Sequence, residues 1–182
     1  VEVLWESDNN SGEISVGAII ADVSLENNAV VLFSATGKEG NAVIAVKDAS
    51  DEILWSWHIW VSDFDQDNTE QMYPTGAIMM DRNLGALSVE YGNVLSWGLF
   101  YQQGRKDPFV GCGDITARTF AATAPANKIY YQSGGDDDIA RKNPNVTLHS
   151  YGSEWTSDKG MNDPCPPGWK VPPTSVFQFS SD

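Results

Sequence analysis

The feature that most constrains the fold is the apolar run at residues 53–61, ILWSWHIWV. Strand side chains alternate between the two faces of a sheet. One face would carry only apolar side chains: Ile53, Trp55, Trp57, Ile59 and Val61. The other would be mixed: Leu54, Ser56, His58 and Trp60. Large apolar faces are usually buried, so we expect the first face to form core and the mixed face to meet a neighbouring layer. A tryptophan row that stacks on sugar rings is the alternative.

The region before this run reads as entirely β. Turn-rich stretches separate five candidate strands, at residues 1–5, 14–23, 30–34, 41–47 and 52–61. Short strands at this spacing are typical of a β-sandwich, and the four-residue loop between the last two predicts a hairpin. Because five strands are too few for a complete sandwich, we expect the missing strands to precede residue 1, in a longer secreted chain.

A polar connection at residues 62–73 marks the predicted domain boundary, which divides the chain into 1–66 and 67–182. It contains Asp63, Asp65 and Asp67 at the alternate spacing of a calcium loop. The full calcium-loop pattern fails because Asn68 stands where glycine is needed and Pro74 where glutamate is needed. We interpret the stretch as a solvated acidic linker, and the three aspartates remain calcium candidates.

A strand followed by a helix is predicted within residues 78–109. The apolar residues at 78–80 read as a buried strand, and residues 83–85 form a turn. Apolar residues then recur at steps of three and four, which predicts a three-turn helix ending near Gly104. Arg105 and Lys106 would lie at its end, where the helix dipole favours cations. We expect Asp81 and Arg82 to pair locally or to brace loops; a catalytic acid beside a base is the alternative.

The charge balance disfavours several classes of partner. The chain has 182 residues, with 11 Lys and Arg against 25 Asp and Glu, a net charge of −14. DNA, RNA and anionic membranes attract a basic surface, so we expect neither nucleic acid nor membrane as a partner. No apolar run of the length that spans a bilayer occurs in the sequence.

Motifs that mark catalysis are missing from the sequence. It has no G-x-S-x-G, no H-E-x-x-H, no phosphate loop and no dinucleotide-binding glycine pattern. Its histidines, His58 and His149, are too few for a metal cluster. We therefore expect no catalytic residues, no cofactor and no metal. An enzyme whose reacting residues lie partly beyond residue 182 remains an alternative.

Three separated blocks carry a family resemblance. They are MDRNLGA at 80–86, GLFYQQGRKDPF at 98–109 and NDPCPPGWKVP at 162–172. In this order they resemble the motifs of the Fibrobacter succinogenes major paralogous domain, which is common in surface proteins of Bacteroidota. The block at 40–61 resembles the sequence that precedes this domain in fimbrillin-like, adhesin-type proteins. The PPGWKVP element is also similar to one in C-type-lectin-like folds, from which this chain departs by inserting Pro173 before Thr174.

The resemblance implies an α+β protein in which a partial N-terminal β-sandwich precedes a C-type-lectin-like α+β domain, with completeness at the C-terminus left open. It implies a cell-surface location, outer-membrane-attached or fimbrial. The expected function is that of a non-enzymatic fimbrial tip, accessory or adhesin-like subunit. Its partners would be a glycan, a host or bacterial surface protein, or other fimbrial subunits. The alternative function is a carbohydrate-binding module of a secreted polysaccharide-degrading system.

Four tryptophans and two cysteines are assigned structural roles. We interpret Trp97 as structural, like Trp55 and Trp57, and we expect Trp169 to fill a core. An oxidising compartment favours a disulfide between Cys112 and Cys165, and two free thiols are the alternative. A bridge closing a loop of roughly fifty residues would contribute on the order of 4 kcal/mol.

Overall fold

The protein is β-rich. A computed structural model describes residues 1–9, 13–109, 129–130, 137–144, 147–148, 155 and 158–177. Its first strands are β1 (Glu2–Ser7), β2 (Glu13–Ile14), β3 (Ile20–Glu26), β4 (Val30–Ala35), β5 (Gly40–Lys47) and β6 (Ile53–Val61). Shorter strands follow: β7 (Glu70–Met72), β8 (Ile78–Met80), β9 (Phe100–Tyr101), β10 (Pro108–Phe109), β11 (Ile129–Tyr130) and β12 (Thr147–Leu148). The described helices are α1 (Asp137–Lys142) and two 3-10 turns, η1 (Val94–Ser96) and η3 (Thr174–Phe177).

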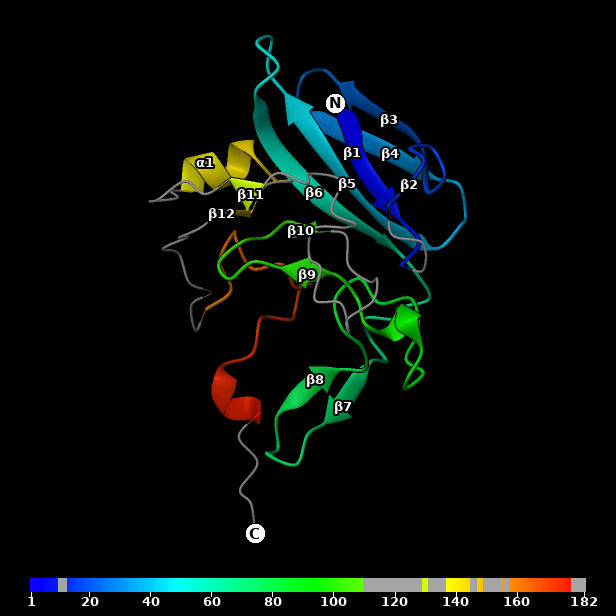
Figure 1. The fold of residues 1–182 in the computed structure, drawn as a ribbon, viewed down its shortest axis with the longest axis vertical. Coiled ribbons are helices and arrows are strands. Elements are labelled where there is room, and N and C mark those ends of the chain that lie inside the picture. The colour runs from blue at the N-terminus through cyan, green and yellow to red at the C-terminus, as the bar shows by residue number, and fades with distance from the viewer. Residues whose placement is uncertain are drawn as a thin grey trace.

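An antiparallel sheet with strand order β2-β1-β5-β6 forms the upper part of the molecule (Figure 1). The predicted hairpin is confirmed, because β5 and β6 pair along their length with Ile44 opposite Trp57. The strand expected at 14–23 is instead divided into β2 and β3. Gly17, at a φ of 95°, lies in the turn between them, and this left-handed conformation ends a strand.

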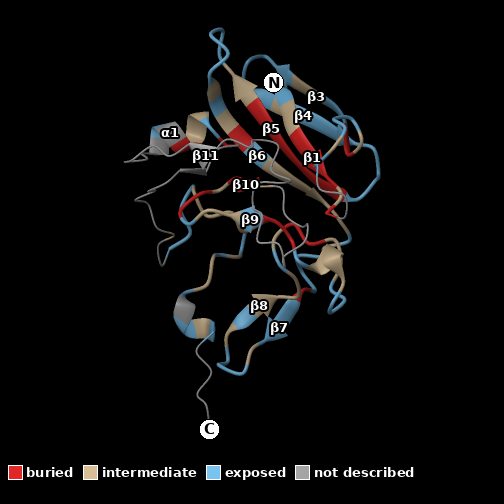
Figure 2. Ribbon diagram, in the orientation of Figure 1, coloured by how far each residue is buried: buried red, intermediate tan, exposed pale blue. Residues whose placement is uncertain are grey.

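Two apolar clusters cover opposite faces of this sheet. On one face, residues from β3 and the turn before it pack on β5, and the buried members are Ile19, Ile20 and Ala42. On the other face Trp5 and Val43 pack against Leu99, which comes from the region after β8. Figure 2 shows the buried residues concentrated in the central strands of the sheet. The sheet is therefore the middle layer of the structure.

The expectation for β6 is partly wrong. Ile59 and Val61 pack on the Ile19 cluster as predicted, but Trp57 on the same face is 36% exposed. That cluster reaches the end of β6 and not its centre. The mixed face meets a neighbouring layer as predicted, since Ser56 is buried and its hydroxyl donates to Asp107 Oδ1 at 2.9 Å.

A buried carboxylate holds the turn between β2 and β3. Glu6 is fully buried in β1 and accepts from the main-chain N–H groups of Ile19 at 2.7 Å, Ile20 at 3.0 Å and Gly17 at 3.2 Å. Because buried main-chain donors need partners, this carboxylate replaces the ladder bonds that the turn cannot make.

A buried polar network joins the sheet to the loop at residues 83–86. The side-chain amides of Asn9 and Asn41 donate to Gly85 O at 2.6 and 2.8 Å. His58 Nε2 lies 2.9 Å from Asn41 Oδ1, an acceptor, so Nε2 carries the proton. Nδ1 then accepts from the Tyr101 hydroxyl at 3.1 Å. His58 is half-buried, both of its ring nitrogens are bonded internally, and burial lowers its pKa to about 3.

The helix expected up to Gly104 is wrong. Only the single turn η1 forms, and the chain then extends into β9. Gly98 adopts a φ of 75°, and a Cβ there would lie 2.5 Å from Leu84 O. The segment crosses the Leu84 loop closely and bonds to it through Leu99 N at 3.0 Å. This contact outweighs the helical spacing of the apolar residues.

Helix α1 forms at residues for which the sequence predicts no helix or strand. Arg141 donates to Ile53 O and Leu54 O, both at 2.8 Å, and so covers one end of the open edge of β6. Arg105, expected at an exposed helix end, is buried and donates to Ala140 O and Asn143 O at the C-terminus of α1. No helix within the described residues is long and apolar enough to cross a membrane.

Candidate functional site

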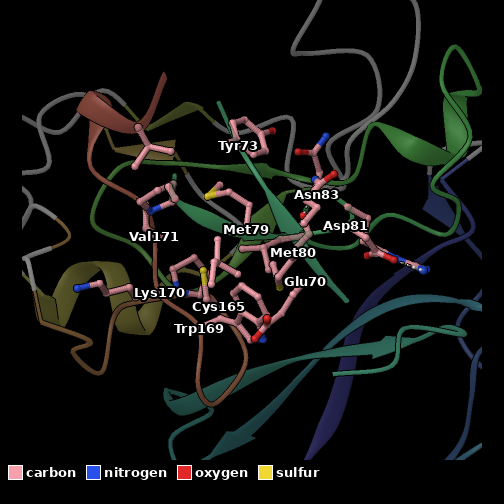
Figure 3. A pocket seen from close by; sticks show the side chains of 18 of the residues that line it. Glu70, Tyr73, Met79, Met80, Asp81, Asn83, Cys165, Trp169, Lys170 and Val171 are labelled. Carbon is pink, nitrogen blue, oxygen red and sulfur yellow. Dashed lines mark hydrogen bonds and ion pairs between the residues drawn. The ribbon is translucent and has the colours of Figure 1, made fainter. Parts of the chain in front are cut away.

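A large open cleft of about 1190 Å³ lies in the lower part of the molecule. One wall is the β7–β8 hairpin, the second is the region around η1 and β9, and the third is the segment 164–177. Figure 3 shows Met79, Met80, Cys165, Trp169 and Val171 gathered around it. Its volume exceeds the roughly 300–1,000 Å³ that is common for small-ligand pockets, so it has room for an oligomeric ligand.

Local turn chemistry builds the hairpin wall. Pro74 sets the φ that a turn requires, and Gly76 adopts a φ of 80°. Gly76 N donates to Tyr73 O and Tyr73 N donates to Ala77 O, each at 2.8 Å. The strand predicted at 78–80 is confirmed as β8, but it is not buried, because Ile78 is 52% exposed.

The opposite wall is held by Asp163. Its carboxylate accepts from Cys165 N at 2.8 Å and Val171 N at 3.0 Å, and it pairs with Lys159. Burial acts to raise the pKa of Asp163, but these hydrogen bonds outweigh it and the pKa is lowered. The charged carboxylate therefore fixes the loop that carries Trp169.

Two hydrogen bonds connect the walls, one near each end of the hairpin. Gln66 Nε2 donates to Pro167 O at 2.7 Å, and the Thr75 hydroxyl donates to Val176 O at 3.2 Å. Near the second bond, the rings of Tyr73 and Phe177 meet edge to face at 6.2 Å. These contacts hold the segment 164–177 beside the hairpin, and the cleft stays open between the segment and the hairpin.

An ion-pair group forms one corner of the cleft. Arg82 Nε and Nη2 donate to Asp81 Oδ1 and Oδ2 at 2.9 and 3.1 Å, and Nη1 donates to Asp63. The predicted pairing of Asp81 with Arg82 is confirmed. Arg82 lowers the pKa of Asp81, so Asp81 stays ionised and is poorly suited to act as a general acid.

Two of the three calcium candidates, Asp63 and Asp65, bond to different partners. Asp63 pairs with Arg82, while Asp65 accepts from Asp67 N at 3.0 Å and Asn68 Nδ2 at 2.7 Å within its own loop. In the part of the chain that the structure describes, no group of three His, Cys, Asp or Glu side chains is placed to hold a metal ion.

The predicted structural tryptophans separate into two regions. Trp97 and Trp169 line the cleft, and Trp97 is 38% exposed. The expectation that Trp169 fills a core is therefore wrong, because its half-buried ring faces an open cavity. Trp55 instead lines a second cavity of about 300 Å³, where Lys106 Nζ lies 4.5 Å from its ring centroid.

The second cavity contains charged groups that bond to the protein itself. Lys106 Nζ donates to Ser56 O at 2.8 Å, to Ser56 Oγ at 2.6 Å and to Asp107 Oδ1 at 2.7 Å. Burial lowers the pKa of Lys106 although Asp107 opposes the shift. All three ammonium protons are engaged, so we interpret this group as the attachment of residues 105–109 to β6.

Cys165 lines the cleft, and its sulfur has no disulfide partner within the part of the chain that the structure describes. Burial, and after it the charge of Asp163, raises its pKa to about 12, so the thiol is protonated and a weak nucleophile. Cys112 lies outside the described residues, as does His149, and the bridge between Cys112 and Cys165 stays a prediction.

Sequence reasoning missed the hairpin wall of the cleft. Residues 70–72 fall within the stretch interpreted as an acidic linker, although the turn residues Pro74, Thr75 and Gly76 follow them. The signal was present, since a turn between two short runs predicts a hairpin. Pairing of β7 with β8 brings Gln71 opposite Met79, and both residues line the cleft.

Comparisons with known proteins identify no relative: no protein-family model, no curated protein and no solved structure matches the chain. The functional conclusion therefore depends on the cleft and on the sequence motifs.

Proposed function

We propose that this protein is a non-enzymatic, adhesin-like cell-surface protein, a fimbrial tip or accessory subunit, that binds a glycan or a surface protein through the cleft. The observation that carries the proposal is an open cavity of about 1190 Å³ with the exposed ring of Trp97 at its edge. Exposed aromatic rings in concave sites are typical anchors for ligands. The ion-paired Asp81 and the protonated Cys165 thiol offer little for acid–base or nucleophilic chemistry.

The motif series gives this proposal its cellular setting. The blocks at 80–86, 98–109 and 162–172 resemble motifs of surface proteins, and a net charge of −14 is compatible with an extracellular domain. The proposal includes a C-type-lectin-like arrangement for residues 67–182, with the sandwich-type region 1–66 as its support. In such an arrangement loops on a rigid scaffold carry the recognition surface.

The test is a glycan array together with a cell-adhesion assay on the purified protein. Binding in either assay supports the proposal, and silence in both removes it. A pull-down on insoluble polysaccharide tests the alternative function, a carbohydrate-binding module, which would bind the polysaccharide. The ring pair recorded in the cleft, Tyr73 with Phe177, has an interplanar angle of 82°. That geometry does not make the coplanar platform expected for a module that binds polysaccharide surfaces.

A further inference from the structure

Among the described residues, no strand pairs with the edge of β8 that faces away from β7, and β8 lines the cleft. Within the described part of the chain, β7 and β8 form a sheet of two strands, and Figure 1 shows β8 on the side of the 164–177 segment. Tyr73 N donates to Ala77 O, so these two residues form a hydrogen-bonded pair of the antiparallel hairpin. Bonded and non-bonded pairs alternate along such a hairpin, so the next pair, Met72 and Ile78, is non-bonded. The main-chain groups of Ile78 therefore point away from β7. Met80 O accepts from Gln71 Nε2 at 2.8 Å, so Ile78 supplies the outward main-chain pair of this edge. An edge with such a pair is a template for another strand.

The lining of the cleft suits a polypeptide better than a sugar. Met79 and Met80 lie on the hairpin side, with Val171 opposite, and methionine adapts to varied apolar partners. The side-chain amides that would recognise sugar hydroxyls bond to the protein itself, since Gln71 Nε2 donates to Met80 O at 2.8 Å and Asn83 Nδ2 to Ser96 O at 3.3 Å. An apolar, extended chain would leave fewer polar groups unsatisfied here than a glycan would.

The acidic stretch beside the hairpin favours a cationic ligand, although the cleft lining itself is balanced, with Glu70 and Asp81 against Arg82 and Lys170. Residues 62–73 contain four acidic side chains and no Lys or Arg, and the acids are Asp63, Asp65, Asp67 and Glu70. Arg82 neutralises part of this charge by pairing with Asp63 and Asp81. The whole chain carries −14, so its field attracts basic segments and repels acidic ones.

We propose that the cleft binds an extended, basic segment of a partner polypeptide. This segment adds as a strand to the open edge of β8, opposite the segment 164–177. This rests on the proposed function, because it names the ligand class of the same cleft. Main-chain hydrogen bonds to Ile78 would fix the register of the added strand. Apolar side chains of the peptide would contact Met79, Met80 and Val171. Lys or Arg residues at the ends of the peptide would pair with the acidic residues of 62–73.

The probe is a short synthetic peptide with alternating Val and Thr, flanked by Lys. Two matched peptides accompany it: one with alternate amides N-methylated, which cannot pair as a strand, and one with Glu flanks. Calorimetric titration should show binding of the Lys-flanked peptide and affinities at least about tenfold lower for the other two. Absence of binding, or equal binding of the N-methylated peptide, overturns the inference.

A pair of protein variants locates the edge. Ile78→Pro removes an outward N–H from the edge of β8, while Met72→Pro changes its cross-strand partner, whose N–H points to the opposite edge. The first should abolish peptide binding and the second should retain it; the reverse result overturns the inference. If Ile78→Pro does not fold, the N-methylated peptide decides the question without a variant. Glycan-array binding that Trp97→Ala abolishes, without peptide binding, refutes this inference and leaves the proposed function standing.

Discussion

At the scale of the residue, Glu6 shows how one side chain can define a turn. Its buried carboxylate accepts three main-chain N–H groups, and no strand partner could replace it there. This role could not be predicted from the sequence, because a glutamate in an alternating strand normally points to solvent. Burial of Glu6 depends on the β2–β3 turn folding back on β1, which is a tertiary event.

We predict that Glu6→Gln lowers the free energy of unfolding by about 1–3 kcal/mol, because the amide NH₂ faces buried donors and leaves them unsatisfied. Urea denaturation followed by tryptophan fluorescence measures this. The control is Glu13→Gln, at an exposed position in β2, which should change stability by less than about 0.5 kcal/mol. Equal effects of the two substitutions would contradict the role assigned to Glu6.

His58 predicts a specific dependence of stability on pH. Its pKa is lowered from 6.5 to about 3 in the folded protein, so between these values the unfolded state binds a proton that the native state does not. The free energy of unfolding should therefore fall as pH is lowered from 6.5, with a slope from this residue of at most about 1.4 kcal/mol per pH unit.

The measurement is the free energy of unfolding between pH 7 and pH 4.5, compared with a His58→Gln variant. Glutamine can keep a bond to Asn41 and does not titrate, so the variant should show a flatter profile. Parallel profiles for the two proteins would contradict the internally bonded, neutral state of His58.

At the scale of the element, a close backbone contact prevents the helix that the apolar periodicity before Gly104 predicts. The apolar spacing after Asn93 favours a helix, but Gly98 has a φ of 75° and lies against Leu84 O. We predict that Gly98→Ala lowers stability by more than Gly92→Ala. Gly92 has a nearly identical φ of 79° with nothing within 4 Å of the added Cβ, so it measures the backbone strain alone.

Gly92→Ala should cost about 1–2 kcal/mol, and Gly98→Ala should exceed it because main-chain atoms must also move. Thermal or urea denaturation measures both. A cost for Gly98→Ala no larger than that of Gly92→Ala would show that the Leu84 contact is not close in solution.

The elements that the sequence predicted well are those whose pairing is local. The β5–β6 hairpin and strand β8 follow from alternation and turn residues within a few positions. The helix before Gly104 and the burial of Trp169 failed, because each depends on which distant segment packs there. Helix α1 was missed, although its cations in the last turn and the following Asn143 and Pro144 are stop signals.

At the scale of the whole molecule, a buried ion pair attaches the second half of the chain to the sheet. Lys106 and Asp107 are both largely buried, and both bond to Ser56 in β6. The two predicted regions, 1–66 and 67–182, are therefore in direct polar contact. Loss of one partner would leave an uncompensated charge at this contact.

We predict that Asp107→Asn lowers the free energy of unfolding by about 3–5 kcal/mol, because it leaves Lys106 buried without its counter-ion. Lys142→Met is the control, since its partners Glu52 and Asp138 are exposed and such pairs contribute about 0–1 kcal/mol. Chemical denaturation of both variants measures the difference, and a small effect of Asp107→Asn would contradict the role of the buried pair.

The central claim is that the cleft between the β7–β8 hairpin and the 164–177 segment is the recognition surface. Adhesion of the purified protein to cells tests this claim with two variants, Trp97→Ala in the cleft and Phe33→Ala on β4. Trp97 is 38% exposed and Phe33 is 48% exposed. We predict that Trp97→Ala reduces adhesion about tenfold, corresponding to roughly 1.4 kcal/mol, while Phe33→Ala retains it. Adhesion that survives Trp97→Ala and is lost with Phe33→Ala would contradict the account.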